Sequence, residues 1–165
     1  MNQITKESII KASTEAVKLW ALSSSQYPSD NILIQLEAES TMIEVISSFA
    51  LNARRTMEVL PKNCKYSLIA KRWNWEPTTA KNVILDLWES LNFIVHAQDL
   101  QIGFERLPQS TSIIQGGAIC IPYILAKTDR KELSYVDPFA MSHAYLYQVM
   151  PLFTVNFTSN QINQN

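Results

Sequence analysis

The chain has 165 residues, of which 47% are hydrophobic, and its formal net charge is −1. This length fits one domain that buries a core without disulfide staples. The small net charge excludes a long-range attraction of the whole molecule to nucleic acid or anionic lipid, so any contact with a polyanion has to be local.

The use of cysteine and the lack of long apolar runs indicate the cellular compartment in which the protein is expected. The only two cysteines, Cys64 and Cys120, are not spaced like metal ligands, so we expect neither a disulfide framework nor a metal site. The first residues contain no apolar stretch of signal-peptide length, and no uncharged run approaches the length of a membrane span. We therefore expect a cytoplasmic protein without membrane contact.

Two long amphipathic helices are predicted first. Apolar residues recur at helical spacing over residues 4–22, where Thr5 is a candidate N-cap. A second helix is predicted from a cap at Ser29 or Asp30 up to Pro61. Its predicted buried face consists of regularly spaced apolar residues: Ile32, Leu36, Ile43, Ile46, Phe49, Ala50, Ala53, Met57 and Leu60. Helices of this length predict an antiparallel pair at the centre of a bundle.

Residues 61–76 form a basic connector, with a short helix predicted over residues 66–73. Two tryptophans follow closely in sequence after the basic residues of this connector and of the preceding helix end. This pattern matters because single-stranded nucleic acid binds to basic groups beside aromatic rings. The candidate nucleic-acid-binding residues are Arg54, Arg55, Lys71, Arg72 and Trp73. The alternative is that the tryptophans pack under the end of the bundle while the lysines solvate its outside.

The strongest periodicity predicts one unbroken helix over residues 77–100, with Pro77 in its first turn. Beside its apolar face runs a second row of side chains: Glu89, Asn92, His96 and Asp99. An imidazole exchanges a proton near neutral pH, so His96 is the first catalytic candidate, with a neighbouring carboxylate to orient it. The alternative is a capping or half-buried polar histidine. The only other histidine, His143, has no acidic neighbour on its helix face and is expected to be structural.

The periodicity then changes from helical to alternating. Two alternating runs predict an antiparallel hairpin at about residues 100–127, and Pro122 predicts that its second strand lies at an edge. Asp137 and Pro138 predict the cap and the first turn of a last helix.

These elements predict a mainly α fold. We expect a helical bundle of four to five helices with a small appended antiparallel β-hairpin, forming one domain over residues 1–153. Residues 154–165 have no charges and many Asn and Gln, so a disordered tail is expected there.

The segment Leu91-Asn92-Phe93-Ile94-Val95-His96 resembles the signature of the HEPN superfamily, in which an arginine, commonly followed by Asn, precedes a histidine on a late bundle helix. Asn92 and His96 match this signature, whereas Leu91 stands in place of the arginine. The resemblance covers about residues 4–100 and the last helix. It implies a helical homodimer common in toxin–antitoxin and antiviral systems.

In active members of that superfamily, the arginine and histidine of two subunits meet and cleave RNA without a metal or cofactor. The histidine handles the proton of the 2′-OH or leaving group, and the arginine holds the scissile phosphate. Leu91 cannot neutralise a phosphate, so activity requires that Arg54 or Arg55 supply the charge from the neighbouring helix. The resemblance thus implies His96, Asn92 and Arg55 as catalytic candidates, and the missing arginine favours an RNA-associated protein without turnover.

Two other readings stay open. A helix over residues 67–74, a short break at residues 75–77 and a helix opened by residues 78–82 are together similar to a helix-turn-helix, with the hairpin as a wing. This reading predicts a DNA-binding regulator. The other reading is a module that only dimerises or binds a partner protein. Expected partners across these readings are a second copy of the chain, RNA, and an antitoxin or other protein.

Overall fold

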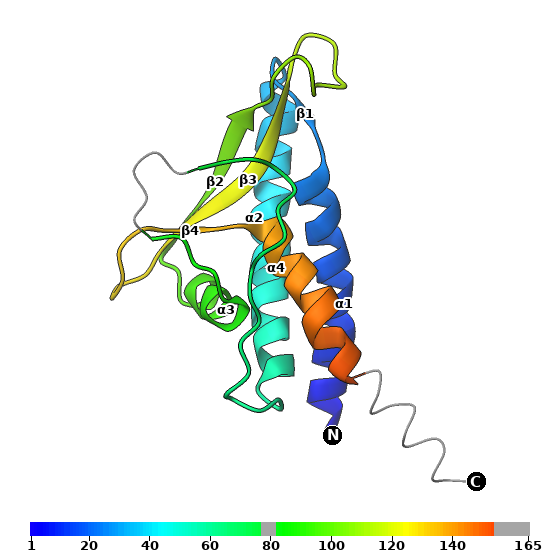
Figure 1. Cartoon of the computed structure of the whole chain (residues 1–165), viewed down its shortest axis with the longest axis vertical. Coiled ribbons are helices and arrows are strands. Elements are labelled where there is room, and N and C mark those ends of the chain that lie inside the picture. Colours follow the sequence, from blue (N-terminus) through cyan, green and yellow to red (C-terminus); the bar gives the residue numbers. More distant parts are fainter. Residues whose placement is uncertain (77–81, 154–165) are drawn as a thin grey trace, which may run out of the picture.

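Two long helices lying side by side form the frame of the fold: α1 Gln3–Ser24 and α2 Ile32–Met57 (Figure 1). The computed structural model describes residues 1–76 and 82–153. Asn2 caps α1 by accepting a hydrogen bond from the Thr5 backbone N–H at 2.8 Å, and Asn31 caps α2 through the Ile34 N–H at 3.1 Å. The predicted helix pair is thus confirmed, but the predicted caps were wrong: the caps are Asn2 instead of Thr5, and Asn31 instead of Ser29 or Asp30.

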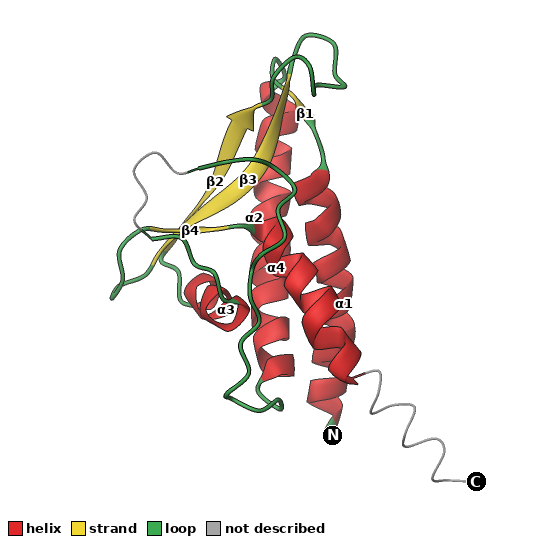
Figure 2. Cartoon of the chain, viewed as in Figure 1, coloured by secondary structure: helices red, strands yellow, loops and turns green. Residues whose placement is uncertain are grey.

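The strands form one four-stranded antiparallel sheet beside the helices (Figure 2). They are β1 Tyr27–Pro28, β2 Asp99–Arg106, β3 Ala118–Lys127 and β4 Ser134–Val136. The β2–β3 pair confirms the predicted hairpin. The sheet is larger than that hairpin, because two short strands from distant parts of the chain add to it. The fold is therefore a mixture of helices and sheet, and the prediction of a bundle with only a small hairpin was too simple.

The prediction that β3 is an edge strand was wrong, since β3 lies between β2 on one side and both β1 and β4 on the other. β1 pairs with Ala118 and Ile119, whereas β4 pairs only from Ile124 onward, so Pro122 falls in the gap between them. On the β2 side the register shifts between Gly103 and Glu105, opposite the proline. A residue without an N–H is tolerated at such a bulge.

The predicted helix over residues 77–100 was wrong in its length. α3 Leu87–Val95 begins only at its N-cap Asp86, and residues 77–81 lie outside the described part of the chain. Before the cap, the chain pairs with other segments: Ile84 N–H donates to Tyr135 O at 3.0 Å, and Leu85 O accepts from Leu68 N–H at 2.9 Å. These non-local backbone hydrogen bonds replace the helical ones.

The connector between α2 and the Asp86 cap contains no helix in its described residues, 58–76 and 82–86, so the predicted helix over residues 66–73 was wrong. This segment runs instead as an extended loop along the molecule (Figure 2). The first helix that the helix-turn-helix interpretation requires is therefore absent from the described residues of this connector.

The last helix begins as predicted, with Asp137 accepting from the Ala140 N–H at 3.0 Å and Pro138 in the first turn. α4 Pro138–Ala144 continues into the π-helical turn η1 Tyr145–Val149. Burial raises the pKa of the Tyr145 phenol to about 12.

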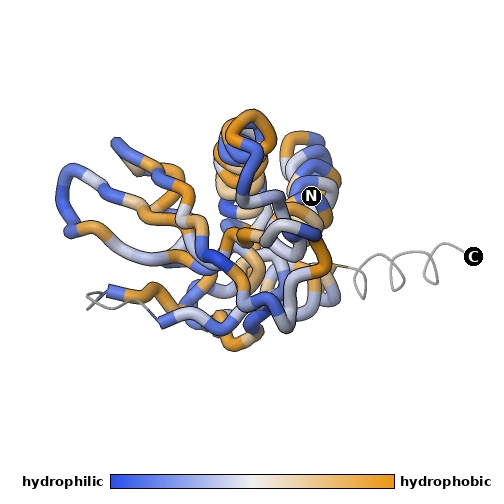
Figure 3. The backbone as a smooth tube through the Cα atoms, turned by 90° about the horizontal axis from the view of Figure 1, so that it is seen from above, coloured by the Kyte–Doolittle hydropathy of each residue, from blue (hydrophilic) through white to orange (hydrophobic). Residues whose placement is uncertain are grey.

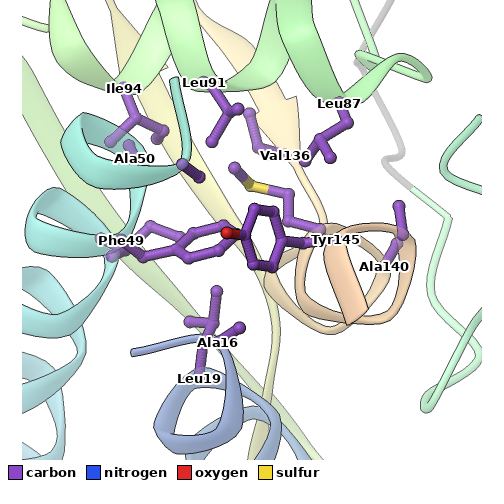
Figure 4. Packing of buried hydrophobic residues seen from close by; sticks show 14 of the residues in the cluster. Ala16, Leu19, Phe49, Ala50, Leu87, Leu91, Ile94, Val136, Ala140 and Tyr145 are labelled. Carbon is purple, nitrogen blue, oxygen red and sulfur yellow. The ribbon is translucent and has the colours of Figure 1, made fainter. Parts of the chain in front are cut away.

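The core lies where α1, α2, α3, α4 and β3 meet (Figure 4). At its centre the rings of Phe49 and Tyr145 contact each other edge to face, with centroids 5.4 Å apart. Leu91 is fully buried in the same cluster. Seen along the axes of α1 and α2, hydrophobic and hydrophilic segments alternate around both helices (Figure 3).

Within residues 1–76 and 82–153, no helix combines the length and the apolar character that crossing a membrane requires. The predicted disordered tail, residues 154–165, lies outside the described part of the chain. The single-domain assignment stays a prediction.

Candidate functional site

α3 carries the predicted histidine at its C-terminal end. Its cap residue His96 donates a backbone hydrogen bond to Asn92 O at 3.1 Å, so the two side chains are one turn apart. Leu87, Leu91 and Ile94 bury the opposite side of the helix against the core. Anchoring by these apolar residues leaves His96 exposed and Asn92 half-buried at the surface.

The closest charged neighbour of His96 comes from another helix. Nη1 of Arg54, in the last turn of α2, lies 3.5 Å from Nε2 of His96, at the long limit of a hydrogen bond. A guanidinium can only donate, so His96 Nε2 is the acceptor in this contact. The structure thus brings an arginine to the histidine, although the position before Asn92 holds a leucine.

Arg54 is held in place by two further contacts. Its Nε lies 3.8 Å from a carboxylate oxygen of Glu58, a distance that allows an ion pair but no hydrogen bond, and this buried Nε has no hydrogen-bond partner. Its Cζ lies 6.0 Å from the centroid of the Trp88 ring. The guanidinium therefore lies between Glu58, Trp88 and His96, and its buried Nε has no hydrogen-bond partner.

Two hollows adjoin this pair of side chains. The first, of about 680 Å³, is lined by α3 and the turn after β3: Trp88, Glu89, Asn92, Phe93, His96, Gln98, Thr128, Asp129, Arg130 and Lys131. The second, of about 740 Å³, is lined by the end of α2 and the connector: Arg54, Met57, Glu58, Leu60, Pro61, Lys62, Cys64, Lys65, Tyr66, Asp86 and Trp88. Trp88 lines both, so the hollows meet at this ring.

The acidic groups of the first hollow are already paired. Glu89 lies 3.7 Å from Lys131 Nζ, and Asp129 lies 3.8 Å from Arg130 Nε. Glu89 is therefore engaged with Lys131 rather than orienting His96 as predicted.

In the second hollow, Asp86 accepts hydrogen bonds from the backbone N–H groups of Glu89 and Tyr66. Lys62 and Lys65 are exposed and have no ion-pair partner within 4.0 Å among the described residues. Burial, together with the nearby Cys64, raises the pKa of the Tyr66 phenol. The hollow is thus open to an anion on its lysine side.

Other predicted site residues are not part of this arrangement. Arg55 is exposed one position further along α2 and lines neither hollow. Asp99 starts β2 and accepts a hydrogen bond from Gln101 instead of contacting His96. Of the two adjacent arginines, Arg54 is therefore the one that lies beside His96.

The predicted nucleic-acid-binding set is divided between two places. Trp73 donates its indole N–H to Ser23 O at the end of α1, and the Arg72 guanidinium lies 4.2 Å from the Trp73 ring centroid. That end of α1 faces the first half of α2, of which even Thr41 lies about 20 Å from Arg54 by the helical rise. Lys71, Arg72 and Trp73 therefore do not extend the site at His96.

His143 lies in an aromatic cluster, as a structural histidine would. Its ring stacks on Tyr147 with centroids 4.5 Å apart and on Trp20 at 5.7 Å. Sequence reasoning missed Trp88 and Lys131 as site residues. Trp88 is half-buried and packs against the core cluster, and its ring also lines both hollows.

Among residues 1–76 and 82–153, no group of three or more His, Cys, Asp or Glu side chains is arranged to hold a metal ion. Searches with this chain found no matching family model, curated protein or solved structure. The resemblance to HEPN proteins therefore stays a prediction.

Proposed function

We propose that this protein binds single-stranded RNA, as an RNA-associated HEPN-like protein of the prokaryotic defence or toxin–antitoxin type, with Arg54 and His96 holding a backbone phosphate. The observation that supports this most strongly is the 3.5 Å approach of Arg54 Nη1 to His96 Nε2 beside the ring of Trp88.

The chemistry of these side chains fits that ligand. The planar fork of a guanidinium binds two phosphate oxygens at once, and the Arg54 side chain is 30% exposed beside His96. An aromatic ring beside it offers a surface for a base, a contact that is typically worth about 1–3 kcal/mol. Lys62 and Lys65 lie along the second hollow, where the next phosphate of a strand would lie.

Binding and cleavage make different demands on the site. Cleavage by the 2′-OH needs one group that accepts its proton and one that donates a proton to the leaving oxygen. His96 provides one such group, whereas His143 is engaged in stacking with Trp20 and Tyr147 elsewhere. We therefore propose RNA binding as the activity of one chain, with cleavage only in a homodimer that brings two His96 side chains together.

The test compares the two adjacent arginines of α2. A short fluorescently labelled single-stranded RNA is titrated with the wild type, Arg54→Gln and Arg55→Gln, and fluorescence anisotropy reports the Kd. Loss of a charge-assisted hydrogen bond at Arg54 is expected to raise the Kd by about 10- to 100-fold. Arg55→Gln removes the same charge at an exposed neighbouring position and is expected to change the Kd by about threefold or less.

An equal loss of RNA affinity in the two variants would show that binding depends only on net charge, and would contradict a specific role of Arg54. If the wild type does not bind the RNA, the proposed function is wrong.

A further inference from the structure

The first turns of α2 expose aliphatic side chains that the sequence pattern assigned to the core. Ile32 is 63% exposed and Leu36 is 53% exposed, although both belong to the predicted buried face. Leu33 and Ile34 beside them are 71% and 41% exposed. All four side chains are thus exposed, but successive helical residues point about 100° apart, so Leu33 and Ile34 border the hollow described next whereas Ile32 and Leu36 point away from it. Exposed aliphatic side chains that gather at one place on a surface mark an interaction site.

A hollow lies next to these residues. It measures about 340 Å³ and is bounded by the end of α1, β1 and the first half of α2: Leu22, Tyr27, Leu33, Ile34, Glu37, Ala38 and Thr41. We call this hollow the α2 groove. Its walls come from two helices, and such a groove accommodates the apolar face of a third helix.

The α2 side of the groove is acidic. Asp30 precedes α2, and Glu37, Glu39 and Glu44 follow along it, whereas no lysine or arginine occurs in α2 before Arg54. Glu37 itself lines the hollow. An occupant with cations flanking its apolar side chains would therefore meet complementary charge.

We infer that the α2 groove binds an amphipathic helix of a partner protein whose aliphatic face is flanked by lysine or arginine. A second copy of this chain docked symmetrically would bring the two acidic edges together, and like charges in close contact disfavour that arrangement. An anionic membrane surface is disfavoured for the same reason.

This inference does not depend on the proposed RNA site. Thr41, the groove residue nearest to Arg54 along α2, lies about 20 Å from it by the rise per residue of an α-helix. A helix in the groove and a nucleic acid at Arg54 therefore do not exclude each other.

The test uses the full chain and a synthetic helical peptide with leucines at helical spacing and lysines on both flanks. A matched peptide carries glutamates in place of the lysines. We expect saturable binding of the lysine peptide by calorimetry, and binding at least tenfold weaker for the glutamate peptide. In Leu33→Ser, truncation of a central apolar contact is expected to weaken lysine-peptide binding about tenfold. Ile10→Ser, at an equally exposed position on α1, serves as the control and is expected to leave it unchanged.

A charge swap provides a second, independent test. Glu37→Lys is expected to weaken the lysine peptide and to strengthen the glutamate peptide, and circular dichroism confirms that the variant is folded. Equal binding of both peptides, no binding of either, or an unchanged affinity in Leu33→Ser would overturn the inference. So would self-association of the wild type that Leu33→Ser abolishes, because the occupant would then be a second copy.

Discussion

The indole N–H of Trp75 donates a hydrogen bond to Oδ2 of Asp137 at 3.3 Å, while Oδ1 of the same carboxylate accepts the Ala140 N–H at 3.0 Å. One buried carboxylate thus caps α4 and anchors the connector that precedes α3. The Trp75 ring also packs on Tyr123 and Tyr135, with centroids 4.9 Å and 5.9 Å away. The connector is therefore attached to both α4 and the sheet.

Replacing Asp137 with alanine removes the cap and the acceptor for Trp75. We expect the free energy of unfolding at neutral pH to fall by about 1–2 kcal/mol, measured by urea denaturation. Asp129→Ala, at an exposed aspartate that caps no helix, is the control and should have little effect. An equal loss in both variants would contradict this role of Asp137.

The same carboxylate makes stability depend on pH. Burial raises the pKa of Asp137 above its ordinary value of 3.8. Hydrogen bonds from Ala140 and Trp75 and the charge of Lys71 lower this pKa, but by less than burial raises it. Between 3.8 and the raised value the folded state binds more protons than the unfolded state, so its stability falls as pH rises through this interval. We expect the difference in unfolding free energy between wild type and Asp137→Ala to grow as pH is lowered through the interval. A difference that shrinks on acidification would contradict the prediction.

Position 91, where the HEPN signature that this segment resembles has an arginine, is not expected to accept a charged side chain. Leu91 is fully buried between α3 and the core (Figure 4), so Leu91→Arg places an unpaired charge there. We expect Leu91→Arg to lose several kcal/mol of stability or to be unfolded, by thermal denaturation. Leu85→Arg, at a leucine that is 65% exposed, is the control and should remain folded. A stable Leu91→Arg variant would show that this position can open to solvent.

The two thiols are expected to differ in reactivity. Burial, with a further contribution from the charge of Glu105, raises the pKa of the Cys120 thiol to about 11, whereas Cys64 is exposed in the second hollow. Because the thiolate is the reactive form, we expect the reagent DTNB to modify Cys64 in the native protein and Cys120 only after denaturation. Cys64→Ser should abolish the native reaction. Bound single-stranded RNA should slow it, and rapid modification of Cys120 in the folded state would contradict the burial of β3.

Features set by local sequence could be predicted, and those set by distant contacts could not. The α1–α2 pair follows from periodicity, and the start of α4 from the Asp137-Pro138 cap. The length of α3 could not be foreseen, because residues 83–85 form backbone pairs with segments far away in sequence. The central position of β3 depends likewise on β1 and β4, which are too short to leave a pattern of their own.

The candidate site was predictable in part for the same reason. Asn92 and His96 share a helix face, so periodicity could place them together. The choice between Arg54 and Arg55 depends on which face of α2 meets α3, and adjacent helical residues point about 100° apart. Ile32 and Leu36 continue the apolar pattern of α2 although that part of the helix extends beyond the core, so the pattern could not show their exposure.

The ring protons of the two histidines provide the most direct test of the proposed phosphate site. NMR spectra are recorded while a short single-stranded RNA is added to the wild type and to Arg54→Gln. The account predicts that the His96 resonances shift on titration, that those of the stacked His143 stay in place, and that the His96 response is largely lost in Arg54→Gln. Shifts confined to His143, or a His96 response that persists without Arg54, would contradict it.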